Sequence, residues 1–277
     1  YLFGATLTMV MEEYPDVYFI AVDVAAGDLT LDYATYYDPT ANVACLTFSE
    51  EQAGYLAGYA AVKDGYTKLG FLGGMAVPAV IRYGYGFVQG VDAAAKELNI
   101  QVELNYVYGG QFFADADITA VMDTWYAGGT EIVFACGGGI YQSAAEAAKK
   151  VGGKIIGVDV DQKAIIDSVY GEGMTVTSAM KGLYPTTVDT LVDVVINGKW
   201  SEYAGKIDTL GLISGEDASK NYVGIPTTTQ FEDGKFTSAD YAALVKAMFE
   251  GSLKVSNDIS AIPATTNVTV TDHGNIK

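Results

Sequence analysis

Short apolar runs alternate with amphipathic segments along almost the whole chain. The runs that predict β-strands are Val17–Val22, Val43–Phe48, Leu69–Leu72, Val102–Val107, Ile132–Cys136, Lys154–Val158, Met174–Ser178 and Lys206–Leu212. Helical periodicity predicts helices over Glu50–Lys63, Ile81–Leu98, Asp115–Ala127, Tyr141–Lys150, Pro185–Ile196 and Ala239–Glu250. This order predicts βαβ units with right-handed crossovers, and therefore parallel sheets covered by helices on both faces.

The number of strands indicates two lobes rather than one. About eight strands are too many for a single compact sheet with this many helices, so we expect an α/β protein with two doubly wound lobes. Thr237 and Asp240 form a capping-box pattern at the start of the last predicted helix. The closing segment, 256–277, alternates Val268 and Val270 with threonine and predicts an irregular, strand-bearing tail.

Composition excludes several classes of protein. The 277 residues carry a formal net charge of −18, which repels phosphate backbones, so we expect no nucleic-acid partner. The only cysteines, Cys45 and Cys136, lie in apolar runs and predict buried free thiols. Because His273 is the sole histidine, no histidine-based triad and no His/Cys zinc site can be built, and we expect neither metal nor cofactor. No stretch reaches the ~18 apolar residues of a membrane span.

Groups that can bind a ligand follow one predicted strand. Asp159, Asp161 and Gln162 come directly after it, and Lys181 follows the next strand. Ligands of open α/β sheets bind outside the carboxyl ends of the strands, where this cluster can grip hydroxyl groups. The alternative is a structural aspartate that caps the next helix. Asp23 ends an earlier strand in the same way. Two such acids in different lobes would face each other across a cleft, where they could bind a ribose or act as general acid and base in a hydrolase.

Glycines and aromatic residues follow other predicted strands. The triple glycine Gly137-Gly138-Gly139 can cradle a phosphate, allow tight strand-to-helix packing or let a neutral ligand approach closely, but it lacks the P-loop pattern. Phe112 and Phe113 lie outside any helical stripe. Their rings can stack on a planar base or a sugar face, or they can be part of the core.

Many of these segments resemble the basic membrane protein family of substrate-binding lipoproteins, of the purine nucleoside receptor (PnrA-like) type that serves ABC importers. The segments that carry the resemblance are Tyr14–Asp23, Asn42–Gly58, Leu69–Gly74, Pro78, Gly86–Val91, Phe112, Gly137-Gly138, Ile156–Gln162, Thr177-Ser178 with Lys181, and Asp258–Ala261. The Gly-Val-Asp-x-Asp-Gln run at 157–162, combined with the Glu-Gln-x-Gly-Tyr-Leu-Ala-Gly run at 51–58, is the most specific part.

The resemblance implies a type I periplasmic-binding-protein fold, with two Rossmann-like lobes joined by a hinge. It places 1–48 and 178–206 in lobe 1, 49–177 and 207–235 in lobe 2, and 236–277 in a C-terminal helix and tail that pack across the lobes. By position it implies ligand-binding roles for seven residues: Asp23 and Asp159 on ribose hydroxyls or neighbouring polar groups, Phe112 or its neighbour Phe113 on the base, Gly137 or Gly138 lining the pocket, and Lys181 in a polar contact.

One part of the family pattern has no match. The family begins with a strand and an acidic, Asn-containing loop that supplies a second stacking Phe and the base-reading Asp and Asn, so we expect a first lobe that is incomplete at its start. The implied function is a monomeric, non-enzymatic, extracytoplasmic receptor that delivers a nucleoside, purine in the first place, to an ABC permease. It would be periplasmic or held by a lipid anchor outside this chain. The alternatives are a sugar or autoinducer receptor, a nucleoside hydrolase, and an effector-sensing domain of a transcription factor.

Overall fold

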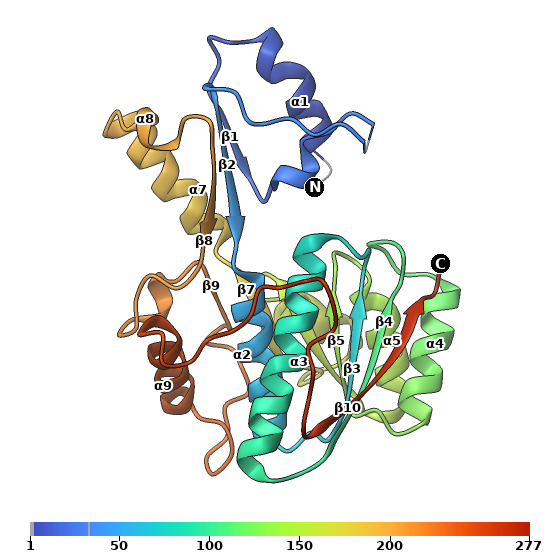
Figure 1. Cartoon of the computed structure of the whole chain (residues 1–277). Coiled ribbons are helices and arrows are strands. Elements are labelled where there is room, and N and C mark those ends of the chain that lie inside the picture. The colour runs from blue at the N-terminus through green and yellow to red at the C-terminus, as the bar shows by residue number, and fades with distance from the viewer. Residues whose placement is uncertain (1–2, 33) are drawn as a thin grey trace. The chain divides into compact units, whose positions relative to one another are not determined.

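The computed structural model describes residues 3–32 and 34–277 (Figure 1). The chain divides into two compact units. Unit 1 consists of the residues up to Ser49 together with Gly182–Gly211, and unit 2 consists of Glu50–Lys181 and Leu212–Lys277. The return to unit 1 begins at Gly182, after strand β7 (Thr175–Lys181) has completed its pairing with β6 (Lys154–Asp159).

Unit 2 is built on a seven-stranded sheet in the order β10-β4-β3-β5-β6-β7-β9. Besides β6 and β7, its strands are β3 (Lys68–Gly73), β4 (Val102–Tyr108), β5 (Ile132–Cys136), β9 (Val223–Gly224) and β10 (Val268–Asn275). All neighbours run parallel except β7 and β9. As the Val268/Val270 alternation predicts, the C-terminal tail forms a strand, which pairs with β4 at the sheet edge. On that strand, His273 contacts Asn105 and the ring of Trp125.

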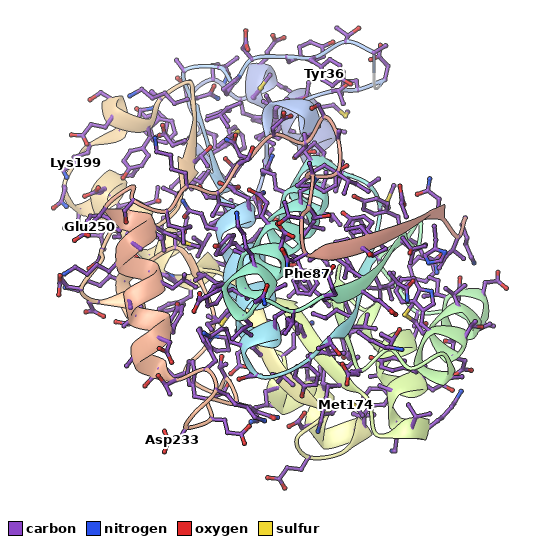
Figure 2. All side chains as sticks on the ribbon, turned by 60° about the horizontal axis from the view of Figure 1, so that its bottom comes forward. Tyr36, Phe87, Met174, Lys199, Asp233 and Glu250 are labelled. Atoms are coloured by element: carbon purple, nitrogen blue, oxygen red, sulfur yellow. The ribbon has the colours of Figure 1, made fainter. Side chains whose placement is uncertain are left out.

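Helices cover both faces of this sheet, because successive strand residues point to opposite sides. The helices of unit 2 are α2 (Glu50–Lys63), α3 (Pro78–Leu98), α4 (Ala116–Ala127), α5 (Tyr141–Val151), α6 (Lys163–Tyr170), α9 (Ser238–Phe249) and the 3-10 turn η3 (Ala218–Lys220). On one face, Phe71 and Phe134 pack against Phe87 of α3, which is labelled in Figure 2. On the other face, Leu72 and Val133 join the core under α4, α5 and α6. The predicted helices did not include α6, which is short and buries only one residue, Ile166.

Helices α2 and α3 lie side by side in unusually close contact (Figure 1). Each helix contributes two glycines spaced four apart, namely Gly54 and Gly58 on α2 and Gly86 and Gly90 on α3. A Cβ atom at Gly86 would lie 2.1 Å from the carbonyl oxygen of Glu51, and one at Gly54 would lie 2.1 Å from that of Tyr83. The two backbones therefore touch where any side chain would hold them apart.

Unit 1 has a three-stranded parallel sheet in the order β1-β2-β8. Its elements are α1 (Gly4–Glu13), β1 (Phe19–Val22), the 3-10 turn η1 (Ala26–Asp28), β2 (Val43–Phe48), α7 (Leu183–Leu191) continued by a π-helical turn (Val192–Ile196), α8 (Trp200–Tyr203) and β8 (Lys206–Leu210). Leu7 and Met11 of α1 pack against Val43 and Cys45 of β2. In the described parts of both units, no helix combines the length and apolarity needed to span a bilayer.

Candidate functional site

The two strand-ending aspartates share an unusual backbone conformation. Asp23 follows β1 with φ of 63°, and Asp159 ends β6 with φ of 64°. The only other non-glycine residue with positive φ in the described part of the chain is Asn99, which ends a helix. This left-handed conformation is uncommon for residues other than glycine, and it concentrates at functional sites. Each unit thus has an aspartate with left-handed backbone conformation at the carboxyl end of a parallel strand.

Asp159 belongs to a chain of alternating charges in unit 2. Lys181, the last residue of β7, is buried, with its Nζ 3.6 Å from Oδ1 of Asp159 and 3.4 Å from Oε1 of Glu50. Glu50 opens α2 and has no exposed surface, and Nε of Arg82 on α3 donates a 2.6 Å hydrogen bond to its Oε2. The Asp159 side chain is 39% exposed, so the buried chain of charges reaches solvent at that carboxylate. Such a buried network holds its members in place because an unpaired buried charge is costly.

Tyr83 completes the surroundings of Asp159. Its hydroxyl donates a hydrogen bond of 3.4 Å to Oδ1 of Asp159, and Nζ of Lys181 lies 5.5 Å from the centre of its ring. The Tyr83 ring is itself held edge-on against Phe134 of β5. The Asp159 carboxylate is therefore oriented from behind by a hydroxyl and an ammonium group.

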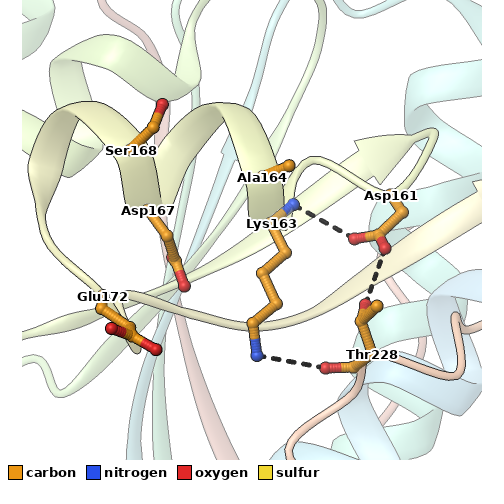
Figure 3. A pocket seen from close by; sticks show the side chains of 7 residues that line it. All are labelled: Asp161, Lys163, Ala164, Asp167, Ser168, Glu172 and Thr228. Carbon is orange, nitrogen blue, oxygen red and sulfur yellow. Dashed lines mark hydrogen bonds between the residues drawn. The ribbon is translucent and has the colours of Figure 1, made fainter.

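The other polar residues of the Asp159 run have structural roles. The Gln162 side chain folds back on its own strand, where its Oε1 accepts the Val158 N–H at 2.9 Å, and the Gln162 backbone N–H donates to Oγ of Ser178. Asp161 lies in a surface pocket, where its carboxylate accepts the Thr228 hydroxyl at 2.7 Å and the Lys163 N–H at 3.1 Å (Figure 3). The three polar groups expected to act together are thus separated, and only Asp159 joins Lys181.

Phe112 lies beyond the carboxyl ends of strands in the same sheet of unit 2. Its ring lies so close to two glycines that a Cβ at Gly74 or Gly137 would come within 2.4 Å or 2.8 Å of its Cδ1 atom. Its carbonyl oxygen accepts the Gly139 N–H at 2.8 Å, and Gly138 beside it has φ of 52°. The backbone of the triple glycine therefore packs directly against Phe112. Phe113, by contrast, is 63% exposed.

The Phe112 ring and the charge network lie at the carboxyl ends of neighbouring strands. Cys136 ends β5 and directly precedes Gly137, on which the Phe112 ring rests. Burial raises the pKa of the Cys136 thiol well above its usual range, and the nearby Asp159 carboxylate raises it further. The charge network is thus close to β5, the strand that leads to the triple glycine. Cys136 and Cys45 are both buried free thiols, as predicted, and burial raises the pKa of Cys45 to about 11, so both stay protonated and unreactive near neutral pH.

Sequence reasoning missed Glu50 and Arg82. Glu50 resembles an ordinary first-turn acid of a helix. One signal was present, because Arg82 is the only arginine in a chain with 34 acidic residues. Among the residues that the structure describes, no group of acidic, histidine or cysteine side chains is arranged to hold a metal ion.

Comparisons with known proteins agree on one family and one fold. The sequence model described as ABC transporter substrate-binding protein PnrA-like (Bmp) matches residues 1–256. The ABC transporter nucleoside-binding protein BmpA of Lactococcus lactis is 28% identical over 187 residues, which cover 63% of this chain and 51% of that protein. Basic membrane protein D of Borreliella burgdorferi is 32% identical over 189 residues, covering 65% of this chain and 53% of that protein. The chain spans about half the length of these relatives. A solute-binding protein of an ABC transporter system from Conexibacter woesei superposes with a TM-score of 0.62 at 22% identity, over 92% of this chain and 76% of that one, and so shares the fold.

Proposed function

Because the chain belongs to the PnrA-like family of ABC transporter substrate-binding proteins, we propose that it captures a nucleoside and delivers it to an ABC importer. Members of this family bind substrates and are not enzymes, so the ligand is released unchanged. The observation that supports a nucleoside most directly is that an aromatic ring, Phe112, and a carboxylate, Asp159, both lie at the carboxyl ends of parallel strands of the unit 2 sheet. The name of the Lactococcus relative, a nucleoside-binding protein, points to the same ligand class.

Each part of a nucleoside has a suitable partner in this arrangement. A base stacked on an aromatic ring gains about 1–3 kcal/mol, and the Phe112 ring lies against glycine backbone. A carboxylate such as Asp159 accepts hydrogen bonds from the paired hydroxyls of a ribose. Asp23, with the same backbone conformation in unit 1, is proposed as a further ligand-binding carboxylate.

The charges of the network favour a nucleoside over a nucleotide. Arg82 and Lys181 supply two positive charges, and Glu50 and Asp159 supply two negative ones, so the network has no net charge. Its solvent-facing end is the Asp159 carboxylate, which would repel a phosphate group. We therefore expect a neutral ligand, purine nucleosides in the first place.

Calorimetric titration against nucleosides, free bases, nucleotides and simple sugars tests the proposal. We expect dissociation constants in the micromolar range or tighter for nucleosides, and the variant Asp159→Ala should weaken binding at least about tenfold while leaving the circular dichroism spectrum intact. Asp161→Ala is a matched control, because that carboxylate lies only two residues away but is engaged with Thr228 in a surface pocket. Binding of sugars alone would overturn the nucleoside proposal, and free base released during incubation would indicate a hydrolase.

We propose that the receptor works as a monomer outside the cytoplasm, held near the permease by a membrane anchor or free in the periplasm. The family name, basic membrane protein, supports an association with the membrane. Cell fractionation of the native host with an antibody against this chain tests the location, and recovery in the cytosolic fraction would contradict it.

A further inference from the structure

We propose that Glu50 is a positioning residue, which holds the Lys181 ammonium away from Asp159 so that the Asp159 carboxylate stays available to the ligand. This inference rests on the proposed function, because it assigns a purpose to a residue behind the proposed nucleoside site. Glu50 has no exposed surface and is expected to touch no ligand itself. Its role would be exerted entirely through Lys181.

The first observation is that Lys181 lies between two carboxylates. Its Nζ is 3.4 Å from Glu50 Oε1 and 3.6 Å from Asp159 Oδ1. These distances are nearly equal, so neither acid holds the ammonium alone. Without the Glu50 charge, the ammonium would be drawn to Asp159, which would then be neutralised by a close ion pair and lose acceptor capacity for ribose hydroxyls.

The second observation is that the two carboxylate oxygens of Glu50 face different cations, Arg82 and Lys181. Its Oε2 accepts the short hydrogen bond from Arg82, whereas its buried Oε1 has no hydrogen-bond partner in the described part of the chain. The Lys181 ammonium lies 3.4 Å from that oxygen. A buried carboxylate oxygen without a hydrogen bond is costly, and the electrostatic attraction of Lys181 offsets that cost.

The third observation is that the fold fixes the position of Glu50. The backbone carbonyl of its neighbour Glu51 touches Gly86, and Gly54 touches the carbonyl of Tyr83, the residue that follows Arg82. The first turn of α2 and the first turns of α3 are therefore locked together by direct backbone contact. The Glu50 carboxylate on α2 is consequently held at a set distance from Arg82 on α3.

A double-mutant cycle on nucleoside affinity tests whether Glu50 acts through Lys181. Glu50→Gln and Lys181→Met should each weaken binding about tenfold, and the double variant should bind about as weakly as Lys181→Met alone. Independent effects would multiply to about a hundredfold, and that result, or wild-type affinity in Glu50→Gln, would overturn the inference. The control Glu51→Gln alters the next buried acid of the same helix turn and should keep wild-type affinity.

A measurement without ligand tests the same inference if the wild-type protein binds no nucleoside. Lys181 is buried, so an amine-reactive ester should label it slowly, with the exposed Lys220 as the internal reference in the same mass spectra. In Glu50→Gln, the labelling rate of Lys181 relative to Lys220 should rise about tenfold as the ammonium moves toward the half-exposed Asp159. An unchanged rate in the folded variant would overturn the positioning role. Absence of nucleoside binding, with a raised rate, would overturn only the proposed function.

Discussion

Replacing Gly86 by alanine is the sharpest test of how unit 2 is assembled. The added Cβ would lie 2.1 Å from the carbonyl oxygen of Glu51 and 2.7 Å from two further backbone atoms of that residue. Carbon atoms in normal contact are about 3.5–4.0 Å apart, so α2 and α3 would have to separate by roughly 1 Å. Because the obstructing atoms are backbone, no side-chain rotation can relieve the overlap.

The magnitude follows from two opposing terms. Overpacking of this kind costs about 3 kcal/mol where the surroundings are rigid, and alanine recovers about 1 kcal/mol over glycine within a helix. We therefore expect Gly86→Ala to lower the free energy of unfolding of unit 2 by about 2 kcal/mol. That is a large part of the ~5–15 kcal/mol typical of a native protein.

Urea unfolding followed by tryptophan fluorescence measures this loss in the correct unit. The two tryptophans are Trp125 in the core of unit 2 and Trp200 in unit 1, so a Trp200→Phe background leaves a reporter for unit 2 alone. With a slope of roughly 2 kcal/mol per molar urea, the midpoint should fall by about 1 M.

The matched control is Gly128→Ala. That glycine ends α4 with φ of −76°, and its added Cβ would come no closer than 3.2 Å to another atom. Its midpoint should stay within about 0.3 M of the wild-type value. A wild-type midpoint for Gly86→Ala would refute the argument that direct backbone contact sets the spacing of α2 and α3.

Three further changes test other parts of the structure. Burial raises the pKa of Asp64 from its ordinary 3.8 to about 7, so the folded state keeps a proton that the unfolded chain releases, and stability falls as pH rises from about 4 to 7. Asp64→Asn should remove this pH dependence and, allowing for the partial exposure of Asp64, stabilise the protein at pH 8 by about 1–2 kcal/mol. If the urea midpoint changes between pH 5 and pH 8 by the same amount in the variant as in the wild-type protein, this prediction is wrong. Phe112→Ala should weaken nucleoside binding about tenfold in calorimetry while Phe113→Ala leaves it unchanged, and the reverse order would assign stacking to the exposed ring. Thr237→Ala removes an N-cap that accepts the Asp240 N–H and should cost about 1 kcal/mol in thermal unfolding, unless α9 is held by its packing alone.

Local pattern was enough to predict most of the elements. The predicted strands Val43–Phe48 and Ile132–Cys136 and the predicted helix Glu50–Lys63 have the observed bounds. The predicted capping box at Thr237 is confirmed. These features depend on residues within a few positions of one another, so hydrophobic periodicity and capping chemistry encode them directly. The two-residue strand β9 escaped because it is too short to show a period.

Some of the candidate site residues could likewise be predicted from local pattern, and others could not. Asp23, Asp159 and Lys181 could be chosen as candidates because the carboxyl ends of parallel strands are where such sheets bind ligands, and the pattern of the chain locates those ends. Phe112 and the glycines were candidates with several roles open. The tertiary structure places the Phe112 ring against these glycines, because strands β3 and β5 are neighbours in the sheet although 61 residues lie between Gly74 and Cys136, whose carbonyl accepts the Gly74 N–H.

The partners of Lys181 were beyond the reach of the sequence. Asp159, Asp161 and Gln162 look equivalent in the chain, yet only Asp159 faces the ammonium, because a left-handed turn at Asp159 and the folding back of Gln162 separate them. Glu50 and Arg82 meet because two helices pack at glycine distance, and neither residue carries a local sign of the other. Periodicity determines which face of an element is buried. Which buried charges meet depends on the crossing of elements far apart in sequence, and that is settled only when the whole sheet and its helices pack together.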